Sequence, residues 1–282
     1  MISPAAVEVH VSWDVLQNYP EQVTITPDSE AEYHHLPSPE SLQNKLLLAD
    51  RGYFKLQYID DVRTAGGHCL IRAKATTNPK VIKGYNRKGQ LLKRFSNGHL
   101  KALKKYIRRN EVVDLDVQGK FPYRLIASWP ADKSEPTLWA TTSPRDSFLA
   151  EAIMKLYRLR WQIELLFKEW KSYCSLGKFN TRKGTMVEGL VWASLLALML
   201  KRHIGNSVAE HSQQELSAFI VAKSTQGWFF QLMLAIQKGT LSELRKAWRW
   251  TCDYLSSYAK RANPDRDKET GRMQYGIKST FS

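Results

Sequence analysis

The chain has 282 residues, of which 43% are hydrophobic, and its formal net charge is +15 at pH 7. That length and apolar content predict a globular protein with one large or two small domains, and they exclude a disordered chain. The excess of positive charge favours a polyanionic partner, with nucleic acid ahead of an acidic membrane surface.

Cysteines, histidines and apolar runs limit the compartment and the metal chemistry. Cys69, Cys174 and Cys252 show no C-x-x-C spacing and the histidines no i,i+4 pair, so neither a disulfide framework nor a zinc site is expected. The start of the chain lacks a signal-peptide pattern. The most apolar window, at 189–201, is too short to span a bilayer and predicts a buried helix. We expect a cytoplasmic protein without a membrane partner.

The first 73 residues predict a parallel α/β unit. Alternation predicts strands at 7–13 and 23–27, and a short helix follows at 38–46 with Ser38 as N-cap and Pro39 at its first position. The run LLLAD at 46–50 predicts a fully buried strand. A helix that stops at Gly66-Gly67 and a third strand, HCLIRAK, complete a strand–helix–strand pattern.

Residues 74–145 combine short strand-like runs, YRLIASW and TLWATTS, with many cations. Between Val62 and Asn110 the sequence has no Asp or Glu, while Lys and Arg recur, among them Lys104, Lys105, Arg108 and Arg109. Phosphate binding is the simplest reason for such one-signed charge, and these four residues are predicted DNA contacts. The alternative is an exposed basic loop that serves solubility.

Helices dominate after residue 146. They are predicted at 147–173, 183–204, 213–222, 227–237 and 240–258, followed by a polar tail from Lys260 that we expect to be mobile.

The predicted helix at 147–173 carries an unusual polar strip. On a continuous helix with about 100° per residue, Tyr157, Arg160, Glu164 and Lys171 fall within roughly 60° of one another, at the border of the apolar face. One reading is an ordinary ion pair between Arg160 and Glu164 at i,i+4, which contributes only a few tenths of a kcal/mol. The other is a functional strip that faces a cleft.

Asp50 favours the functional interpretation. It ends a predicted buried strand, where functional groups of parallel sheets are usual, although a local turn with an Asp50–Arg51 pair is the plain alternative. Asp50 on the sheet and Glu164 on the helix are two carboxylates that can share Mg²⁺, with water and substrate phosphates as the remaining ligands. Arg160 and Lys171 would then bind the phosphate backbone.

These residues resemble a known family. Tyr157-x2-Arg160-x3-Glu164-x6-Lys171 resembles the Y-R-E-K signature of bacterial insertion-sequence transposases of the DDE class, and LLADRGYF at 47–54 is similar to the segment with their second catalytic aspartate. The resemblance extends from about Val7 to about Ile204.

The resemblance implies an α/β fold and a reaction. The fold is a ribonuclease-H-like core, 1–73 and 146–204, with a β-rich basic insertion at 74–145, then a C-terminal helical region at 205–259 and a polar tail at 260–282. The family cuts and joins double-stranded DNA at the inverted-repeat ends of its element, as a dimer, with two Mg²⁺ ions for which Mn²⁺ substitutes. Asp50 and Glu164 become catalytic metal ligands, and Tyr157, Arg160 and Lys171 become contacts to DNA phosphates.

The same resemblance indicates a departure. The family's first aspartate precedes the segment that VEVHVSWDVL resembles, so we expect a truncated and inactive copy without this acid; Asp14 does not match its position. The alternative function is a non-catalytic DNA-binding remnant that inhibits a full-length transposase by mixed dimerisation. In related transposases an aromatic residue of the insertion stacks on a flipped base, but for Trp129 and Trp139 core packing is the preferred interpretation.

Overall fold

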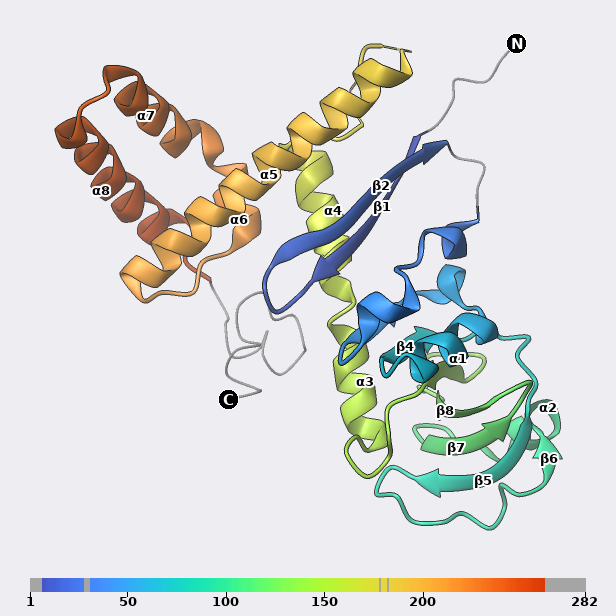
Figure 1. Ribbon diagram of the computed structural model, residues 1–282. Helices are drawn as coiled ribbons and strands as arrows, with labels where there is room; N and C mark the ends of the chain where they lie inside the picture. The colour runs from blue at the N-terminus through green and yellow to red at the C-terminus, as the bar shows by residue number, and fades with distance from the viewer. Residues whose placement is uncertain (1–6, 28–30, 178, 182, 262–282) are drawn as a thin grey trace. The chain divides into compact units, whose positions relative to one another are not determined.

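A computed structural model describes residues 7–27, 31–177, 179–181 and 183–261 (Figure 1). The chain divides into two compact units. The sheet unit consists of Glu8–Ser12 and Gln22–Arg160. The described part of the helical unit consists of residues 7, 13–21 and, apart from 178 and 182, 161–261. Most of the predicted polar tail, from residue 262 onward, lies outside the described residues.

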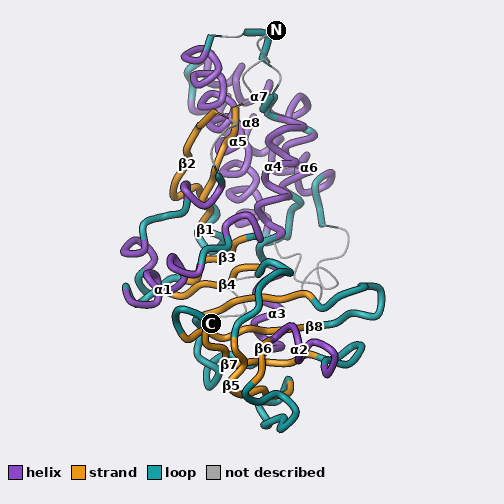
Figure 2. Tube along the Cα trace, turned by 90° about the vertical axis from the view of Figure 1, so that its right-hand side faces the viewer, coloured by secondary structure: helices purple, strands orange, loops and turns teal. Residues whose placement is uncertain are grey.

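The sheet unit is built on one mixed sheet of seven strands in the order β3-β4-β9-β8-β7-β5-β6. Figure 2 shows β3 and β4 side by side, with β8, β7 and β5 farther along the same sheet. The strands are β3 (Leu46–Ala49), β4 (His68–Arg72), β5 (Lys80–Asn86), β6 (Gly98–His99), β7 (Val112–Gln118), β8 (Pro122–Ser128) and β9 (Thr137–Thr141). The strands of 74–145 therefore continue the sheet that β3 and β4 begin.

The predicted parallel unit is confirmed. β3 pairs with β4 in parallel, with Leu46 opposite His68 and Ala49 opposite Ile71, and α1 (Leu56–Thr64) connects them. Gly67 is required after α1 because a Cβ there would lie 2.4 Å from the Leu42 carbonyl oxygen. Two details of the prediction are wrong. The helix expected at 38–46 is a single 3-10 turn, η2 (Pro39–Leu42), and only Ala49 of β3 is fully buried.

Both faces of the sheet are covered. One face packs under α1 and the short α2 (Leu100–Leu103) around fully buried Val62, Ile71 and Leu125. The other face packs under α3 (Ala150–Arg158) around Leu70, Ile126, Ala150 and Ile153. Neighbouring residues such as Leu70 and Ile71 serve opposite faces because successive side chains of a strand alternate.

The first two strands form a separate two-stranded sheet, β1 (Val7–Asp14) with β2 (Tyr19–Pro27). The Asp14 carboxylate accepts hydrogen bonds from the backbone N–H groups of Leu16 and Gln17, each at 2.8 Å. Asp14 therefore stabilises the hairpin turn, which is an ordinary role for aspartate in such a loop.

The helix predicted at 147–173 is two helices, so that prediction is wrong. α3 ends at Arg158 and α4 (Trp161–Tyr173) starts after a tight turn, in which the Leu159 N–H bonds the Leu156 carbonyl at 2.9 Å and the Arg160 N–H bonds the Tyr157 carbonyl at 3.1 Å. These i→i+3 bonds interrupt the α-helical phase. No Gly or Pro marks the turn. The single helical wheel from which the continuous polar strip was inferred therefore does not apply across this turn.

The described helical unit contains five helices: α4, α5 (Gly184–Ser212), α6 (Ala218–Lys223), α7 (Thr225–Lys238) and α8 (Leu241–Tyr258). Four of them, α5 to α8, contribute to a core around the buried Trp228. Trp228 shares a core with Val208, Val221, Cys252 and Leu255. The prediction for 240–258 is confirmed almost to the residue, whereas the helix predicted at 213–222 begins only at Ala218.

Helix α5 differs from its prediction. It has 29 residues, which by length and composition is enough to cross a membrane, and 22% of its apolar window is buried. The helix predicted at 183–204 is present but continues to Ser212, and the expectation that its apolar window at 189–201 is buried is wrong, since Leu190, Leu196 and Leu200 are exposed. Core helices of soluble proteins pass the same test, and the buried Arg202 of α5 bonds the Glu169 carboxylate of α4 at 2.7 Å. Length and composition alone are thus weak grounds for a membrane span.

Candidate functional site

Asp50 sits where β3 ends and the 3-10 turn η3 (Arg51–Tyr53) begins. Its backbone is extended and its carbonyl accepts the Tyr53 N–H at 3.1 Å, but its side chain makes no capping hydrogen bond to η3. Instead, the Tyr157 hydroxyl donates a hydrogen bond to Oδ1 of Asp50 at 3.3 Å. The structure thus joins two residues that lie 107 positions apart and that the sequence analysis assigned to one site.

Tyr157 is held on α3 by apolar packing. Buried Ala150 and Ile153 fix α3 against the sheet, and Tyr157 packs beside them. The Trp139 ring meets the Tyr157 ring edge-on, with centroids 5.8 Å apart. Burial raises the pKa of Tyr157 to about 12; the charge of Arg160 opposes this rise and the charge of Asp50 adds to it. The phenol therefore keeps its proton at neutral pH.

Two arginines border this site. The Arg160 guanidinium carbon lies 5.6 Å from the centroid of the Tyr157 ring. Arg72 ends β4, beside the end of β3, and its charge also lowers the pKa of Tyr157. Arg72 was not identified from the sequence, although the carboxyl ends of parallel neighbours meet at one sheet edge. Asp50, Arg72, Tyr157 and Arg160 are the candidate site of the sheet unit.

Glu164 and Lys171 lie on α4 and belong to the helical unit. Glu164 occupies the first turn of α4 and is partly buried, while Lys171 lies in its last turn and is exposed. The four residues of the proposed signature are therefore divided, two to each unit. The pairing of Asp50 with Glu164 at one metal remains a prediction.

Asp50 has the donor chemistry of a Mg²⁺ ligand. Its carboxylate is partly exposed and is not used to cap η3. Among the described residues, no group of three or more His, Cys, Asp or Glu side chains forms a metal site. One carboxylate suits Mg²⁺, which takes one or two from the protein and fills its other positions with water and phosphate oxygens.

The four predicted DNA-binding cations of the insertion differ in availability. Lys104 bonds the Ala75 carbonyl at 3.1 Å, so it takes part in the fold. Arg109 bonds the Lys133 carbonyl and lies 4.5 Å from the centroid of the Trp129 ring. Lys105 and Arg108 are exposed, and their charged groups make no hydrogen bond or ion pair with any residue that the structure describes.

Both tryptophans of the insertion pack against core clusters, which was the preferred interpretation of the sequence. Trp129 packs against the main core of the sheet unit and its indole N–H bonds the Lys133 carbonyl at 3.0 Å. Trp139 packs against the cluster under α3. The core-packing interpretation is confirmed for both.

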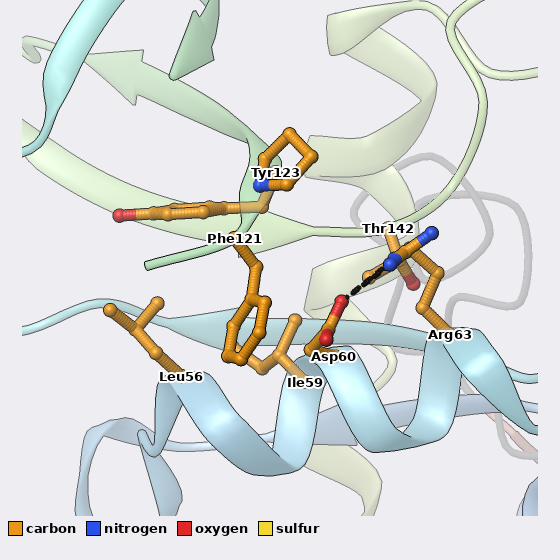
Figure 3. A pocket seen from close by; sticks show the side chains of 8 residues that line it. Leu56, Ile59, Asp60, Arg63, Phe121, Tyr123 and Thr142 are labelled. Atoms are coloured by element: carbon orange, nitrogen blue, oxygen red, sulfur yellow. Dashed lines mark hydrogen bonds and ion pairs between the residues drawn. The ribbon is translucent and has the colours of Figure 1, made fainter. Parts of the chain in front are cut away.

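A small cavity lies elsewhere in the sheet unit, between α1 and β8. Its volume is about 10 Å³, and Figure 3 shows Leu56, Phe121 and Tyr123 around it, with the Asp60–Arg63 ion pair at one side. This volume holds about one water molecule. It is too small for a substrate, so it does not compete with the region around Asp50.

Comparison with known proteins gives concordant matches. The family model described as "Transposase DDE domain" matches residues 5–200, well over half of the chain. The transposase for insertion sequence element IS231F of Bacillus thuringiensis subsp. israelensis is 25% identical over 239 residues, covering 68% of this chain and 49% of that protein. The transposase for IS1151 of Clostridium perfringens is 20% identical over 286 residues, covering 84% of this chain and 59% of that protein.

A shorter match is more similar. The putative transposase InsL for IS186A of Escherichia coli (strain K12) is 34% identical over 77 residues, or 27% of this chain and 21% of that protein. The chain spans about half the length of the curated relatives it matches over most of its residues. On the match of residues 5–200, the chain belongs to the transposase DDE-domain family.

Proposed function

We propose that the chain acts in the transposition of a bacterial insertion sequence, as a DNA-binding and metal-binding part of a DDE transposase. The observation that carries the proposal is the family match over 5–200, within which Asp50 directly follows β3 and has a carboxylate that η3 does not use. In this proposal β3, α1 and β4 belong to a ribonuclease-H-like core. The protein works on DNA in the bacterial cytoplasm, at the nucleoid.

Asp50 and Glu164 are the proposed ligands of Mg²⁺, for which Mn²⁺ substitutes. Bound in pairs, such ions activate an attacking water or 3′-hydroxyl and stabilise the leaving oxygen of a phosphodiester. The chain's own contribution is to present hard oxygen donors, which Mg²⁺ prefers. Arg160 and Lys171 are the proposed contacts to the adjoining DNA phosphates, because both are cations that bind phosphate oxygens.

Lys105 and Arg108 are the proposed phosphate contacts of the insertion. Both are exposed, and neither charged group forms a hydrogen bond or ion pair with a described residue, unlike Lys104 and Arg109; the Lys105 ammonium lies 5.2 Å from the centroid of the Tyr106 ring. Each phosphate contact releases counterions, and binding to duplex DNA then weakens with salt by a slope of roughly 0.9 per contact.

A duplex-binding titration over a range of salt concentrations tests this assignment. The double variant Lys105→Ala/Arg108→Ala should bind more weakly and lose about 2 from the salt slope. The matched control is Arg245→Ala/Arg249→Ala, which removes the same charge from exposed positions of α8. Equal losses in both variants would show that only net charge matters, and would overturn the assignment.

Strand cleavage needs a separate test. Two-metal catalysis requires a ligand that bridges both ions. The residues that match the family's motifs include two acids, Asp50 and Glu164. We therefore expect the 282-residue chain alone to bind element-end duplexes without nicking them in Mg²⁺. Nicking that disappears in Asp50→Ala would refute this expectation and leave the transposase proposal standing.

The non-catalytic remnant is distinguished by its response to metal. A pure binder should keep the same duplex affinity in Asp50→Ala and Glu164→Ala, and Mg²⁺ should not change it. A metal-binding transposase segment should bind duplex more tightly with Mg²⁺, and both variants should remove that gain. Light scattering of the complex with an inverted-repeat duplex tests the proposed homodimer.

A further inference from the structure

We propose that Tyr157 positions the Asp50 carboxylate for metal binding, instead of contacting a DNA phosphate as the family resemblance implies. This inference rests on the proposed metal-binding role of Asp50. It assigns Tyr157 as a positioning residue, which acts on the metal through another side chain.

The hydrogen bond between the two residues decides the role of the hydroxyl. Tyr157 has one O–H proton, and it donates that proton to Oδ1 of Asp50 at 3.3 Å. A phosphate contact by the same donor would require this bond to break. The bond leaves Oδ2 and a second lone pair of Oδ1 available, so Asp50 remains competent to bind a cation.

The surroundings of the ring fix where the hydroxyl points. The Trp139 ring lies edge-on at 5.8 Å, and Ile153 anchors α3 on the face of the sheet that β3 shares. Swinging the hydroxyl toward solvent would lift the ring from this cluster.

The main chain at Asp50 explains why a positioning residue is useful. Asp50 follows a four-residue strand and its side chain has no capping bond to η3, so local structure alone does not fix its rotamer. Carboxylates that bind metals are commonly oriented by an outer hydrogen bond, whose loss lowers metal affinity about 10–100-fold. Tyr157 supplies such a bond from a different element of the same unit.

The test removes only the hydroxyl. Tyr157→Phe keeps the ring and its packing, and Tyr123→Phe is the matched control: Tyr123 is a partly buried tyrosine of the same unit whose buried hydroxyl bonds no group in the described part of the chain. Mn²⁺ binding is measured by electron paramagnetic resonance, on the full chain with and without a duplex, and Asp50→Asn defines the Asp50-dependent sites. Duplex affinity is measured separately in EDTA.

We expect Tyr157→Phe to weaken Asp50-dependent Mn²⁺ binding about tenfold and to leave duplex affinity in EDTA unchanged, with Tyr123→Phe like the wild type. Unchanged Mn²⁺ binding together with weaker duplex binding would overturn the positioning role and restore the phosphate contact. Wild-type protein without any Asp50-dependent Mn²⁺ binding would overturn the proposed metal function as well. Circular dichroism of each variant verifies the fold.

Discussion

The buried carboxylate of Asp114 gives the sharpest prediction for the stability of the sheet unit. Asp114 lies on β7 with a 1% exposed side chain, between two arginines. Arg124 of β8 donates to both of its oxygens at 2.6–3.0 Å, and Arg145 donates to it at 2.9 and 3.1 Å. Among the described residues, Asp114 is the only acid that hydrogen-bonds the Arg124 guanidinium. The substitution Asp114→Asn removes that negative charge.

The size of the effect follows from burial. The Arg124 side chain is 7% exposed, so its charge would be left uncompensated in the interior, which costs about 3–5 kcal/mol. The control is Asp116→Asn, on the same strand and with the same loss of charge. Asp116 is 39% exposed, and among the described residues its ion pair is with Arg145, beside an interaction with the Tyr85 hydroxyl; solvent screens the ion pair, so its loss should cost about 0–1 kcal/mol.

Thermal unfolding followed by circular dichroism measures the difference. For a unit of this size, about 2–4 °C is lost per kcal/mol, so Asp114→Asn should lower the transition of the sheet unit by roughly 6–20 °C. Asp116→Asn should lower it by less than about 4 °C. If the two variants unfold within about 2 °C of each other, the reasoning from burial is wrong.

Three further predictions concern other parts of the chain. Gly67→Ala should destabilise the sheet unit by about 1–3 kcal/mol in urea, because its Cβ would lie 2.4 Å from the Leu42 carbonyl oxygen; an unchanged midpoint would contradict this. Burial raises the pKa of Tyr157 to about 12, so its contribution to stability is present below the unfolded pKa of about 10 and is lost as the pH rises toward 12. In an alkaline titration, the difference in absorbance at 295 nm between wild type and Tyr157→Phe should therefore develop nearer pH 12 than pH 10. A difference that develops near pH 10 would contradict the raised pKa of Tyr157. Glu169→Gln should destabilise the helical unit by about 3–5 kcal/mol, because it leaves the buried Arg202 charge unpaired. Thermal unfolding curves of variant and wild type that coincide, recorded by ellipticity at 222 nm, would contradict this prediction.

The elements whose boundaries are set by nearby residues were predicted well from the sequence. The apolar run before Asp50, the paired glycines after α1 and the run HCLIRAK are sufficient for a parallel strand–helix–strand unit. The boundaries of α7 and α8 were predicted closely because Gly239 adopts φ 69° after α7 and Thr240 caps α8. Caps and glycines act within a few residues, so they are legible in a single sequence.

Features with tertiary causes were missed. The turn at Leu159-Arg160 has no sequence marker, so a helical wheel carried across it placed Glu164 and Lys171 in a continuous strip with Tyr157. The C-terminal end of α5 was predicted at residue 204, whereas the helix continues to Ser212 and ends where Gln213 adopts φ 52°. The Tyr157–Asp50 contact was anticipated only as shared membership of a site, since its hydrogen bond depends on how α3 packs against the sheet.

The network around Asp114 connects this stability to the candidate site. The run VVDLDVQ alternates, which on sequence alone predicts that Asp114 faces solvent. The face is instead covered by the segment between β9 and α3, because Arg145 of that segment bonds Asp114 and packs 3.8 Å from the centroid of the Tyr85 ring. That segment leads directly into α3, so the ion pairs on β7 help to fix where α3 begins. The buried charge network therefore supports the start of α3, the helix whose Tyr157 hydroxyl bonds Asp50 near its other end.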